Sequence, residues 1–527
     1  MDSRRHVWLI LLACNFSFAS PRYVKNQWIV RSTAERSTWA DIKSEKRLRL
    51  LKVFGPKREF ALIEGDRGII KFLPRIKYIQ RNFIYQVADS MDPDFEKSWG
   101  LKNTGQQIED KQGTAGADID AERAWDIFKG NSNIVVAVLD SGIQRSHEDL
   151  QNNLWKNPGE IPANNKDDDG NGYIDDTWGW NFIDNNNKTD DDYSHGSFCA
   201  GIIGADAHNQ KGSRGVNWKT SLMAVKIIDH LGFGTSESVL GGITYAVKQG
   251  ANVLNASFRV EGWDQGLYDL IQWAGTKNVL VVASAGNLSL DNDEDENPTY
   301  PASFDLPNII SVASYNSKDR LSSFSNYGKS KVDIGAPGER IFSTKLDGYR
   351  IADGTSYAAP FVTGVAALVK AYNPGLSLQE WKNRILLTST PLEYYEKEHV
   401  ATAGRVNAYN ALKDIRPARP AVPTHWKAHA LNLSTPHPYL NDKVESFTVQ
   451  HPGANFIRVH FRNFHTEKKD DPVTLRDSEG RIVRVYSGDR GDFFSADAIG
   501  STMHIDFKPD FYKTEYGFDI DRYEVRD

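Results

Sequence analysis

Three segments of the chain place an aspartate, a histidine and a serine where they could act together as a nucleophilic catalyst. Asp140 directly follows the apolar run Ile134–Leu139, His195 opens one apolar segment, and Ser356 opens another within Gly354–Pro360. A serine hydroxyl is a weak nucleophile, so a histidine must take its proton and a buried aspartate must orient the imidazole. We therefore expect Ser356 to attack, His195 to transfer the proton and Asp140 to hold His195.

A fourth segment could supply the charge stabilisation that these three residues lack. Asn287 follows the apolar run Val279–Ala283. Its amide and the backbone N–H of Ser356, at a helix N-terminus, could form an oxyanion hole. Losing one such donor typically lowers turnover about 10²–10³-fold. Each motif alone is common in turns and caps, but the four together in this order indicate a hydrolytic site.

The elements that carry these residues alternate between strands and helices from about residue 134 to residue 413. The predicted strands are Ile134–Leu139, Leu222–Ile228, Val253–Ala256, Val279–Ala283 and Ile309–Ala313, and the predicted helices include Ser236–Gln249, Leu267–Thr276 and Tyr357–Tyr372. Short Val- and Ile-rich runs between helices predict an α/β fold with a mostly parallel sheet covered on both faces. The catalytic candidates should then meet at one rim of the sheet.

The N-terminus has the pattern of an export signal. A cationic start, Arg4–His6, precedes the short apolar run Val7–Ala13, and Ser17 and Ala19 suit a cleavage after residue 19. An alternative is a bacterial lipoprotein signal with lipid on Cys14. No other stretch reaches about 18 apolar residues, so we expect no transmembrane segment and a secreted or envelope-anchored product.

Charge divides the rest of the chain unevenly. Residues 20–88 hold 16 Lys and Arg against 6 Asp and Glu, although the whole chain is −6. This basic segment reads as a small α+β unit, with strands at Tyr23–Arg31, Glu59–Ile63 and Ile76–Val87 and a helix at Ala40–Leu51. At the other end, a proline-rich linker at 415–426 precedes short alternating segments that predict a β-sandwich over 427–527.

The motifs around the four candidates resemble those of subtilisin-like serine endopeptidases, with features of the proteinase K and thermitase branches. The matching segments are Asp140-Ser141-Gly142, His195-Gly196-Ser197 to Ala200-Gly201, Ala285-Gly286-Asn287 and Gly354 to Pro360, within a similarity from about Asp92 to Leu412. This resemblance implies a catalytic domain at 89–414 that hydrolyses peptide bonds in proteins. It also implies substrate contacts at Gly232, Phe233, Gly234, Ser257 and Gly286.

The resemblance also gives the basic segment a role. Residues 20–88 resemble the inhibitory propeptide of the family, which implies a zymogen that is cut near Val87. A basic propeptide on an acidic enzyme is electrostatically complementary. Cys199 lies four residues after His195, on the same helix face, where a small buried hydrophobe is the favoured interpretation and a thiol sensitive to heavy metals is the alternative.

A long acidic insertion between Asp140 and His195 predicts a structural Ca²⁺ site. Its loop offers oxygen ligands at Asp167, Asp169, Asn171, Tyr173 and Asp175, with Gly172 among them. The usual final glutamate is replaced by Trp178, so another ligand is needed, and Asp176 and Asp184 are candidates. A solvated acidic loop is the alternative. The run 291–296 after Asn287 could likewise be a solvated loop or a feature of the cleft.

The C-terminal segment resembles a CUB-type β-sandwich without its cysteines. In calcium-binding members the ligands correspond to Glu467, Asp471 and Asp510, although these could be ordinary surface acids. The resemblance implies a role in targeting to a surface or protein partner, or in stability. Phe258-Arg259-Val260 departs from the family pattern beside Ser257, so Arg259 could narrow the primary pocket or point to solvent.

Composition excludes several other classes of protein. The chain has only two cysteines, too few for a disulfide scaffold, and its charge gives no reason to expect nucleic acid. We expect a monomer. A catalytically silent protein that binds through residues 427–527 is an alternative, which the complete set of four residues argues against. An esterase would need a Gly-x-Ser-x-Gly elbow and the order Ser, Asp, His, and neither is present.

Overall fold

The computed structural model describes residues 23–33, 35–83, 92–294, 297–392, 399–418, 426–468, 470–478, 480 and 482–526. The chain divides into two compact units, residues 1–89 (unit 1) and 90–527 (unit 2). The expected leader with Cys14, the cleavage region near Val87 and most of the proline-rich linker lie outside the described residues. Within the described parts, no helix is both long enough and apolar enough to cross a membrane.

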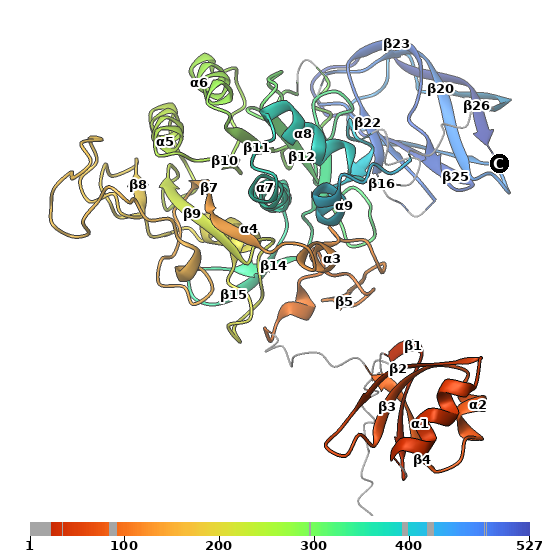
Figure 1. The fold of residues 1–527 in the computed structure, drawn as a ribbon. Coiled ribbons are helices and arrows are strands. Elements are labelled where there is room, and N and C mark those ends of the chain that lie inside the picture. The colour runs from red at the N-terminus through yellow and green to blue at the C-terminus, as the bar shows by residue number, and fades with distance from the viewer. Residues whose placement is uncertain are drawn as a thin grey trace, which may run out of the picture. The chain divides into compact units, whose positions relative to one another are not determined.

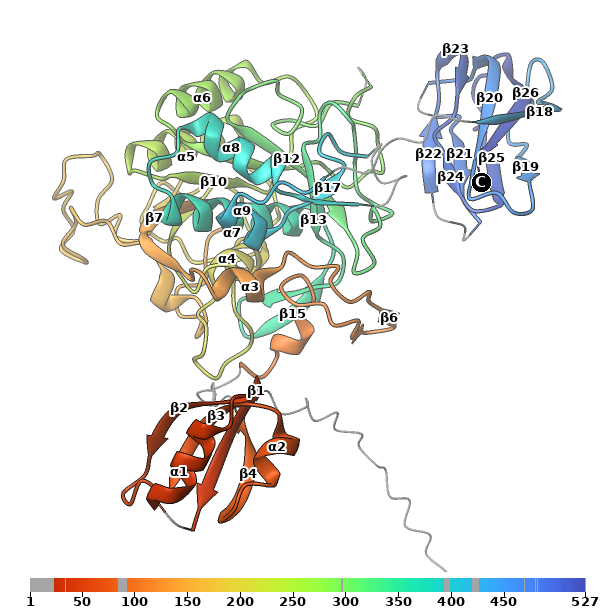
Figure 2. The same cartoon turned by 45° about the vertical axis from the view of Figure 1, so that its right-hand side comes forward.

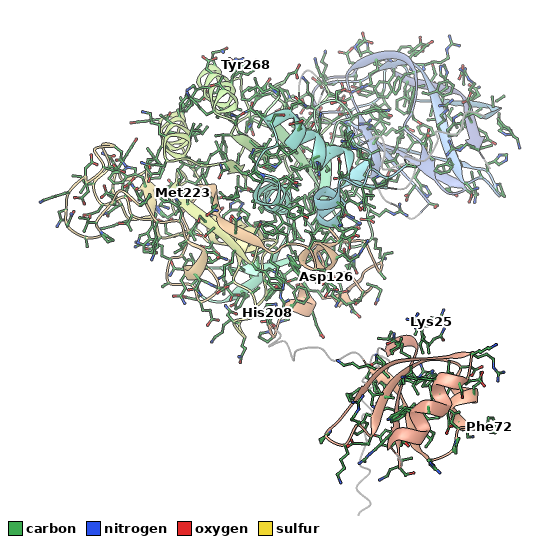
Figure 3. The ribbon with its side chains drawn as sticks, viewed as in Figure 1. Lys25, Phe72, Asp126, His208, Met223 and Tyr268 are labelled. Carbon is green, nitrogen blue, oxygen red and sulfur yellow. The ribbon has the colours of Figure 1, made fainter. Side chains whose placement is uncertain are left out.

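Unit 1 is a four-stranded antiparallel sheet, in the order β2-β3-β1-β4, with two helices. The elements are β1 (Tyr23–Ser32), α1 (Glu35–Ser44), β2 (Leu48–Phe54), β3 (Phe60–Gly65), α2 (Arg67–Lys71) and β4 (Ile76–Phe83). The helix expected over Ala40–Leu51 is wrong in its second half, because residues 48–54 face the core only intermittently and pair with β3. Phe72 projects from this unit with 87% of its surface exposed (Figure 3).

A nine-stranded sheet forms the centre of the larger part of unit 2, in the order β16-β17-β13-β12-β11-β10-β7-β9-β8. Its strands are β7 (Gly130–Asp140), β8 (Gly179–Asn181), β9 (Lys219–Lys226), β10 (Val253–Ala256), β11 (Leu280–Ser284), β12 (Ile309–Tyr315), β13 (Ile334–Pro337), β16 (Thr390–Pro391) and β17 (Gly404–Arg405). Every pairing is parallel except β16 with β17. The mostly parallel α/β fold predicted from the apolar runs is confirmed.

Helices cover both faces of this sheet, as Figures 1 and 2 show. The described helices and short hairpins of this part are η1 (Phe95–Lys97), β5 (Gln107–Ile108), β6 (Lys111–Gln112), α3 (Ala121–Trp125), η2 (Gln151–Asn153), α4 (His195–Gly204), α5 (Ser236–Lys248), α6 (Gln265–Thr276), β14 (Ile341–Thr344), β15 (Tyr349–Ala352), α7 (Thr355–Tyr372), α8 (Leu378–Leu387) and α9 (Ala408–Lys413). Helices α5 and α6 pack on one face and α4 and α7 on the other.

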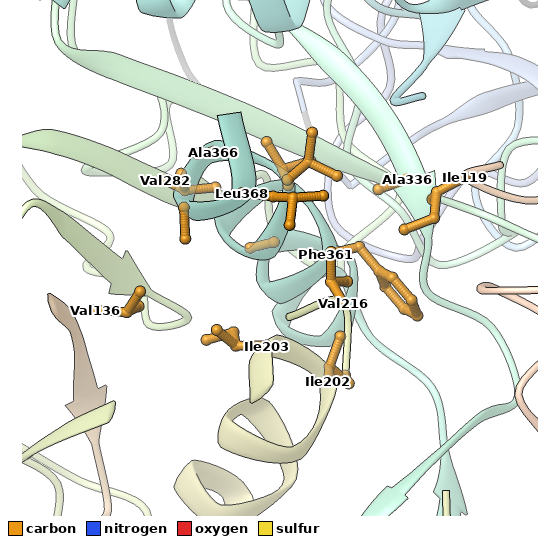
Figure 4. Close-up of a cluster of buried hydrophobic side chains, with 14 of the residues drawn as sticks. Ile119, Val136, Ile202, Ile203, Val216, Val282, Ala336, Phe361, Ala366 and Leu368 are labelled. Carbon is orange, nitrogen blue, oxygen red and sulfur yellow. The ribbon is translucent and has the colours of Figure 1, made fainter. Parts of the chain in front are cut away.

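The sequence of β7 explains why both faces are covered. Its side chains alternate between two apolar cores: Val136 and Val138 pack with α4 and α7, whereas Ala137 and Leu139 pack with α5 and α6. Successive side chains of a strand point to opposite faces, so a continuous apolar run requires an apolar neighbour on each side. Figure 4 shows the first core, where Phe361 of α7 lies near Val216 and near Ile202 of α4, and Leu368 of α7 lies near Val282 of β11.

The C-terminal part of unit 2 consists of two antiparallel sheets around a separate apolar core. One sheet contains β18 (Lys427–Ser434), β20 (Phe456–His465), β23 (Asp489–Phe494), β24 (Ala498–Ile499) and β26 (Gly517–Arg526), and the other contains β19 (Glu445–Gln450), β21 (Val473–Arg476), β22 (Ile482–Tyr486) and β25 (Thr502–Phe507). Phe461, Phe464, Phe507 and Phe518 are fully buried between them. This part therefore has the two antiparallel sheets that the alternating segments indicate.

Close packing against α7 gives a test of this fold. A Cβ added at Gly364 would lie 2.6 Å from Cβ of Val216, which is backed by the core. Gly364→Ala should therefore lower the free energy of unfolding by about 1–3 kcal/mol, although alanine is the better helix former. Gly375→Ala is the matched control, because nothing lies within 4 Å of a Cβ there. Denaturant unfolding of both variants, in a Ser356→Ala background that prevents self-digestion, measures the difference; equal stabilities would contradict this packing.

Candidate active site

The carboxyl end of β7 places Asp140 directly beside His195 at the start of α4. Nδ1 of His195 lies 2.8 Å from Oδ1 and 2.9 Å from Oδ2 of Asp140. The carboxylate is 2% exposed and also accepts the backbone N–H of Ser141. A buried carboxylate that contacts Nδ1 leaves Nε2 of the imidazole to accept a proton from another group.

The surroundings of His195 favour its charged form. Burial acts to lower the pKa of the imidazole, but the charge and hydrogen bond of Asp140 outweigh it, so the pKa lies above its ordinary value. The ring is 19% exposed and lies 5.4 Å, between centroids, from the ring of Tyr357. A histidine of this kind can accept a proton at neutral pH and hold the resulting charge.

Ser356 is the second residue of α7, and a proline fixes the surroundings of its carbonyl. Position 360, four residues on, is Pro360 and lacks the N–H that would normally bond that carbonyl. Instead, the carbonyl accepts hydrogen bonds from Oγ of Ser257 at 2.8 Å and from Sγ of Cys199 at 3.4 Å. Helices α4 and α7 and the segment after β10 are thereby joined at Ser356. Cys199 is fully buried, and burial raises the pKa of its thiol well above its usual range, as expected of a small core residue.

The hydroxyl of Ser356 donates to the carbonyl of Ser257 at 3.2 Å. His195 and Ser356 nevertheless line one cleft. Catalytic hydrogen bonds are often long or poorly aligned in free enzymes, so this rotamer is compatible with proton transfer to His195 in a substrate complex.

Asn287 lies beyond the carboxyl end of β11 and is tied to the start of α7. Its Oδ1 accepts both the backbone N–H and the hydroxyl of Thr355, at 2.9 and 2.8 Å. With Oδ1 engaged, the amide has its Nδ2 hydrogens for another acceptor. The preceding residue, Gly286, is buried with φ of 113°, and a Cβ there would lie 2.6 Å from the side chain of Asn326. Glycine is therefore required for this turn.

The cleft beside these residues is walled by two segments of backbone. It is lined by Gly232, Phe233, Gly234, Ser257, Phe258, Arg259, Val260 and Glu261, together with Asp140, His195 and Ser356. Arg259 lies in this wall, is 40% exposed and pairs with Glu261 at 3.3 Å. Gly232, Phe233, Gly234 and Ser257 thus share one cleft with Asp140, His195 and Ser356, whereas Gly286 and Asn287 are not among the residues that line it.

Comparison with known proteins identifies the family. The subtilase family (peptidase S8) matches residues 131–411, just over half of the chain. The chain belongs to the subtilase family. Thermitase from Thermoactinomyces vulgaris is 36% identical over 301 residues, which cover 56% of this chain and 94% of thermitase. A thermophilic serine proteinase from Bacillus sp. strain AK1 is 28% identical over 421 residues, covering 76% and 90%. A cell wall-associated protease from Bacillus subtilis is 32% identical over 306 residues, covering 58% and 30%.

Family membership and these relatives make this subtilase a serine endopeptidase with protein substrates. The matched region contains Asp140, His195, Asn287 and Ser356. It also contains the acidic insertion.

Within that insertion, three carboxylates converge. Oxygen atoms of Glu160, Asp169 and Asp176 all lie within 4.8 Å of one another, so they could hold a metal ion. Glu160 is 8% exposed and its Oε2 is buried with no hydrogen-bond partner. Burial raises the pKa of Glu160, and the charges of Asp176 and Asp169 raise it further. An oxygen-only cluster with an unpartnered buried atom fits Ca²⁺.

The predicted ligands of this loop fall into two groups. Asn171 lies with the cluster, its Nδ2 3.1 Å from Asp169 and 3.0 Å from Asp176. Asp167 and Asp175 instead accept backbone N–H groups of the loop. The ring of Tyr173 packs against Tyr245, Trp180 and Phe182. Asp184 binds the side chain of Asn181. Glu160 was not predicted from the sequence, because it precedes the loop whose spacing indicated the ligands.

Two other acidic groups predicted from the sequence also have defined surroundings. Glu467, Asp471 and Asp510 converge within 4.8 Å in the C-terminal part, and Oε2 of Glu467 is buried without a partner. In the run after Asn287, Asp291 contacts Arg484 of β22, and Glu294 pairs with Arg490 of β23 at 2.9 Å. Asp291 and Glu294 are therefore paired with arginines, whereas Asp293 accepts the backbone N–H groups of Ser330 and Lys331; residues 295 and 296 lie outside the described residues.

The contact with Asp140 predicts a raised pKa for the imidazole of His195. Its imidazole should protonate at a pH above the ordinary value of 6.5, and Asp140→Asn should move that pKa downward. Since the folded pKa is the higher one, the pair stabilises the fold fully below pH 6.5 and loses that contribution as the pH rises through the folded value. NMR titration of the histidine side chains in Ser356→Ala and in Ser356→Ala/Asp140→Asn checks this; no difference between the two would contradict it.

Proposed function

We propose that Asp140, His195 and Ser356 form the catalytic triad of this subtilase. The observation that carries the proposal is the contact of both Asp140 oxygens with Nδ1 of His195, at the rim of a cleft that Ser356 also lines. Oγ of Ser356 attacks the scissile carbonyl while Nε2 of His195 takes its proton. The imidazolium then protonates the leaving amine, and a water molecule, activated in the same way, hydrolyses the acyl-enzyme.

Stabilisation of the developing oxyanion falls to Asn287 and the backbone N–H of Ser356. The contacts of Thr355 with Oδ1 orient the amide of Asn287, so its donor is fixed before substrate binds. Backbone groups of Gly232–Gly234 and of Ser257, on the two walls of the cleft, would bind an extended peptide. Gly286 lets the chain approach Asn326 closely and keeps Asn287 beside α7.

We further propose that the enzyme is exported and made as a zymogen. Residues 1–19 would direct export, 20–88 would inhibit the enzyme, 89–414 would form the catalytic domain, and 415–426 would connect it to the sandwich at 427–527. The excess of basic residues in 20–88 supports docking onto an acidic enzyme. One relative is named a cell wall-associated protease, which supports an extracellular location.

Removal of the nucleophile tests the triad and the zymogen together. Ser356→Ala should abolish casein hydrolysis and leave the chain uncut near Val87, because no acyl-enzyme can form. The matched control is Ser289→Ala, a surface serine near Asn287 whose hydroxyl bonds only the carbonyl of Ser323 among its described contacts. Gel mobility and release of casein peptides measure both effects. Persistent hydrolysis by Ser356→Ala would refute the triad.

For the cation, we propose a structural Ca²⁺ held by Glu160, Asp169 and Asp176, with Asn171 beside them. Glu160 would take the place of the glutamate that usually ends such a loop. Bound calcium would supply positive charge that cancels the repulsion among the three carboxylates. Tyr245 of α5 donates to Asp176 at 2.6 Å, so the ion would also fasten this insertion to the catalytic domain.

Calcium binding can be tested on one ligand and one control. At a calcium concentration 100 times Kd, the ion should raise the free energy of unfolding by about 2.7 kcal/mol, and EDTA should remove this gain. Glu160→Gln should weaken Ca²⁺ binding by about tenfold or more, because a charged ligand is lost. Asp184→Asn should leave it unchanged. Calorimetric titration in the Ser356→Ala background measures both; equal affinities would exclude Glu160 as a ligand.

A second cation site and a targeting role are proposed for the C-terminal sandwich. Burial raises the pKa of Glu467, and Asp471 and Asp510 raise it further, so a cation there would relieve repulsion as well. Asp471 is fully buried and also accepts the hydroxyl of Tyr439. The sandwich would then direct the protease to a surface or a protein partner.

A further inference from the structure

Three consecutive aspartates precede His195, and each has different partners. Asp190 pairs with Arg145, with Nε 3.0 Å from its carboxylate. Asp192 accepts Nζ of the buried Lys226 at 2.6 Å. Asp191, between them, points inward and is 6% exposed. The acidic run therefore contains one carboxylate that belongs to the interior of the site.

Asp191 provides the N-terminal cap that α4 otherwise lacks. The residue at the cap position, Ser194, has a left-handed backbone with φ of 78° and no side-chain cap. Oδ1 of Asp191 accepts the backbone N–H groups of Tyr193 and Ser194 at 3.0 and 2.8 Å, and Oδ2 accepts that of Ser197 at 2.8 Å. A negative charge there also suits the positive end of the helix dipole.

The same carboxylate is joined to the strand that carries Asp140. Oγ of Ser141 donates to Oδ1 of Asp191 at 2.8 Å and accepts the backbone N–H of Gly196 at 3.0 Å. Ser141 is fully buried, and its carbonyl accepts Nζ of Lys226 at 2.7 Å. Ser141 follows Asp140 in the sequence, and Gly196 follows His195. Asp191 and Ser141 thus join the end of the strand that carries Asp140 to the start of the helix that carries His195.

We propose that Asp191 is a positioning residue for proton transfer: through Ser141 and the first turn of α4 it sets the geometry of His195 on Asp140. The inference rests on the proposed triad. The fixed negative charge of Asp191 also favours the imidazolium that forms as Ser356 loses its proton. Among the described residues, the titratable and charged groups close to His195 are Asp140, Asp191, Arg350, Cys199, Tyr193 and Tyr357, and the positive charge of Arg350 opposes the imidazolium.

Asp191→Asn tests this role, because it removes the charge but keeps a similar shape. In the full-length chain, allowed to mature, kcat on a peptide substrate should fall on the order of ten- to a hundredfold with KM nearly unchanged. The acid limb of kcat/KM should move to lower pH, since the imidazolium loses support. Asp190→Asn is the matched control and should leave both readings unchanged. Active-site titration corrects each rate for the fraction of competent enzyme.

Ser141→Ala provides a second test if Asp191→Asn does not fold. It removes the link to Asp191 while the charge remains, so kcat should fall but the acid limb should move less than in Asp191→Asn. Unchanged kcat in either folded variant, or a rise in KM alone, would overturn the proposal. An unshifted acid limb in Asp191→Asn would also overturn it. Failure of the wild-type chain to hydrolyse peptides, or activity in Ser356→Ala, would instead overturn the proposed function.

Discussion

The active site depends on a helix, α7, that is almost entirely buried. Helix α7 contacts β7, β10, β11, β12 and β13, and its residues from Tyr357 to Val369 are buried. Its packing is close also against the segment before β9, where a Cβ added at Gly364 would lie 2.6 Å from Cβ of Val216. Because its direction is fixed by this packing, its first turn lies at the carboxyl ends of the strands, where Ser356 faces the cleft.

Burial of that first turn leaves the backbone carbonyl of Ser356 in need of a hydrogen-bond donor, and residues of the site provide it. Pro360 leaves the carbonyl of Ser356 without its helical partner, and a buried carbonyl without a hydrogen bond is costly. Ser257, which directly follows β10, and Cys199 of α4 both donate hydrogen bonds to it. Ser257 is itself fixed, since the amide of Asn255 donates a hydrogen bond to its Oγ at 2.9 Å. The same amide accepts a hydrogen bond from the hydroxyl of Thr363, in α7, at 2.8 Å. The groups that orient Ser356, the proposed nucleophile, are thus the ones that satisfy the buried backbone.

Most of the catalytic domain could be predicted because its signals are local. The strand over Val253–Ala256 was predicted with its observed bounds, and the predicted starts and ends of α5, α6 and α7 differ from the observed ones by two residues at most. The error at Ala40–Leu51 arose where charged residues hid the alternation of a strand. Leu48 and Leu50 show that pattern only when the pairing with β3 is known.

Glu160 and Asp191, which were not predicted from the sequence, make contacts that no local pattern encodes. Glu160 precedes the acidic loop by several residues, so a search of ligand positions within the loop could not reach it. Asp191 was hidden among many aspartates, and only the structure separates it from Asp190 and Asp192. Its partner Ser141 lies 50 residues earlier in the chain. Neither carboxylate was given a role from the sequence, because burial is decided by the fold.

One hydrogen bond of the acidic insertion would connect the proposed metal site to the substrate cleft. Three carboxylates within 4.8 Å repel one another, so the insertion needs the proposed cation to hold this geometry. Asp176 accepts a hydrogen bond from the hydroxyl of Tyr245, a residue of α5 that is 1% exposed. The first turn of α5 is fixed at Thr235 by a capping box, and Thr235 directly follows the cleft segment Gly232–Gly234. Loss of the ion would therefore loosen α5 and, with it, one wall of the cleft, so calcium would support substrate binding as well as stability.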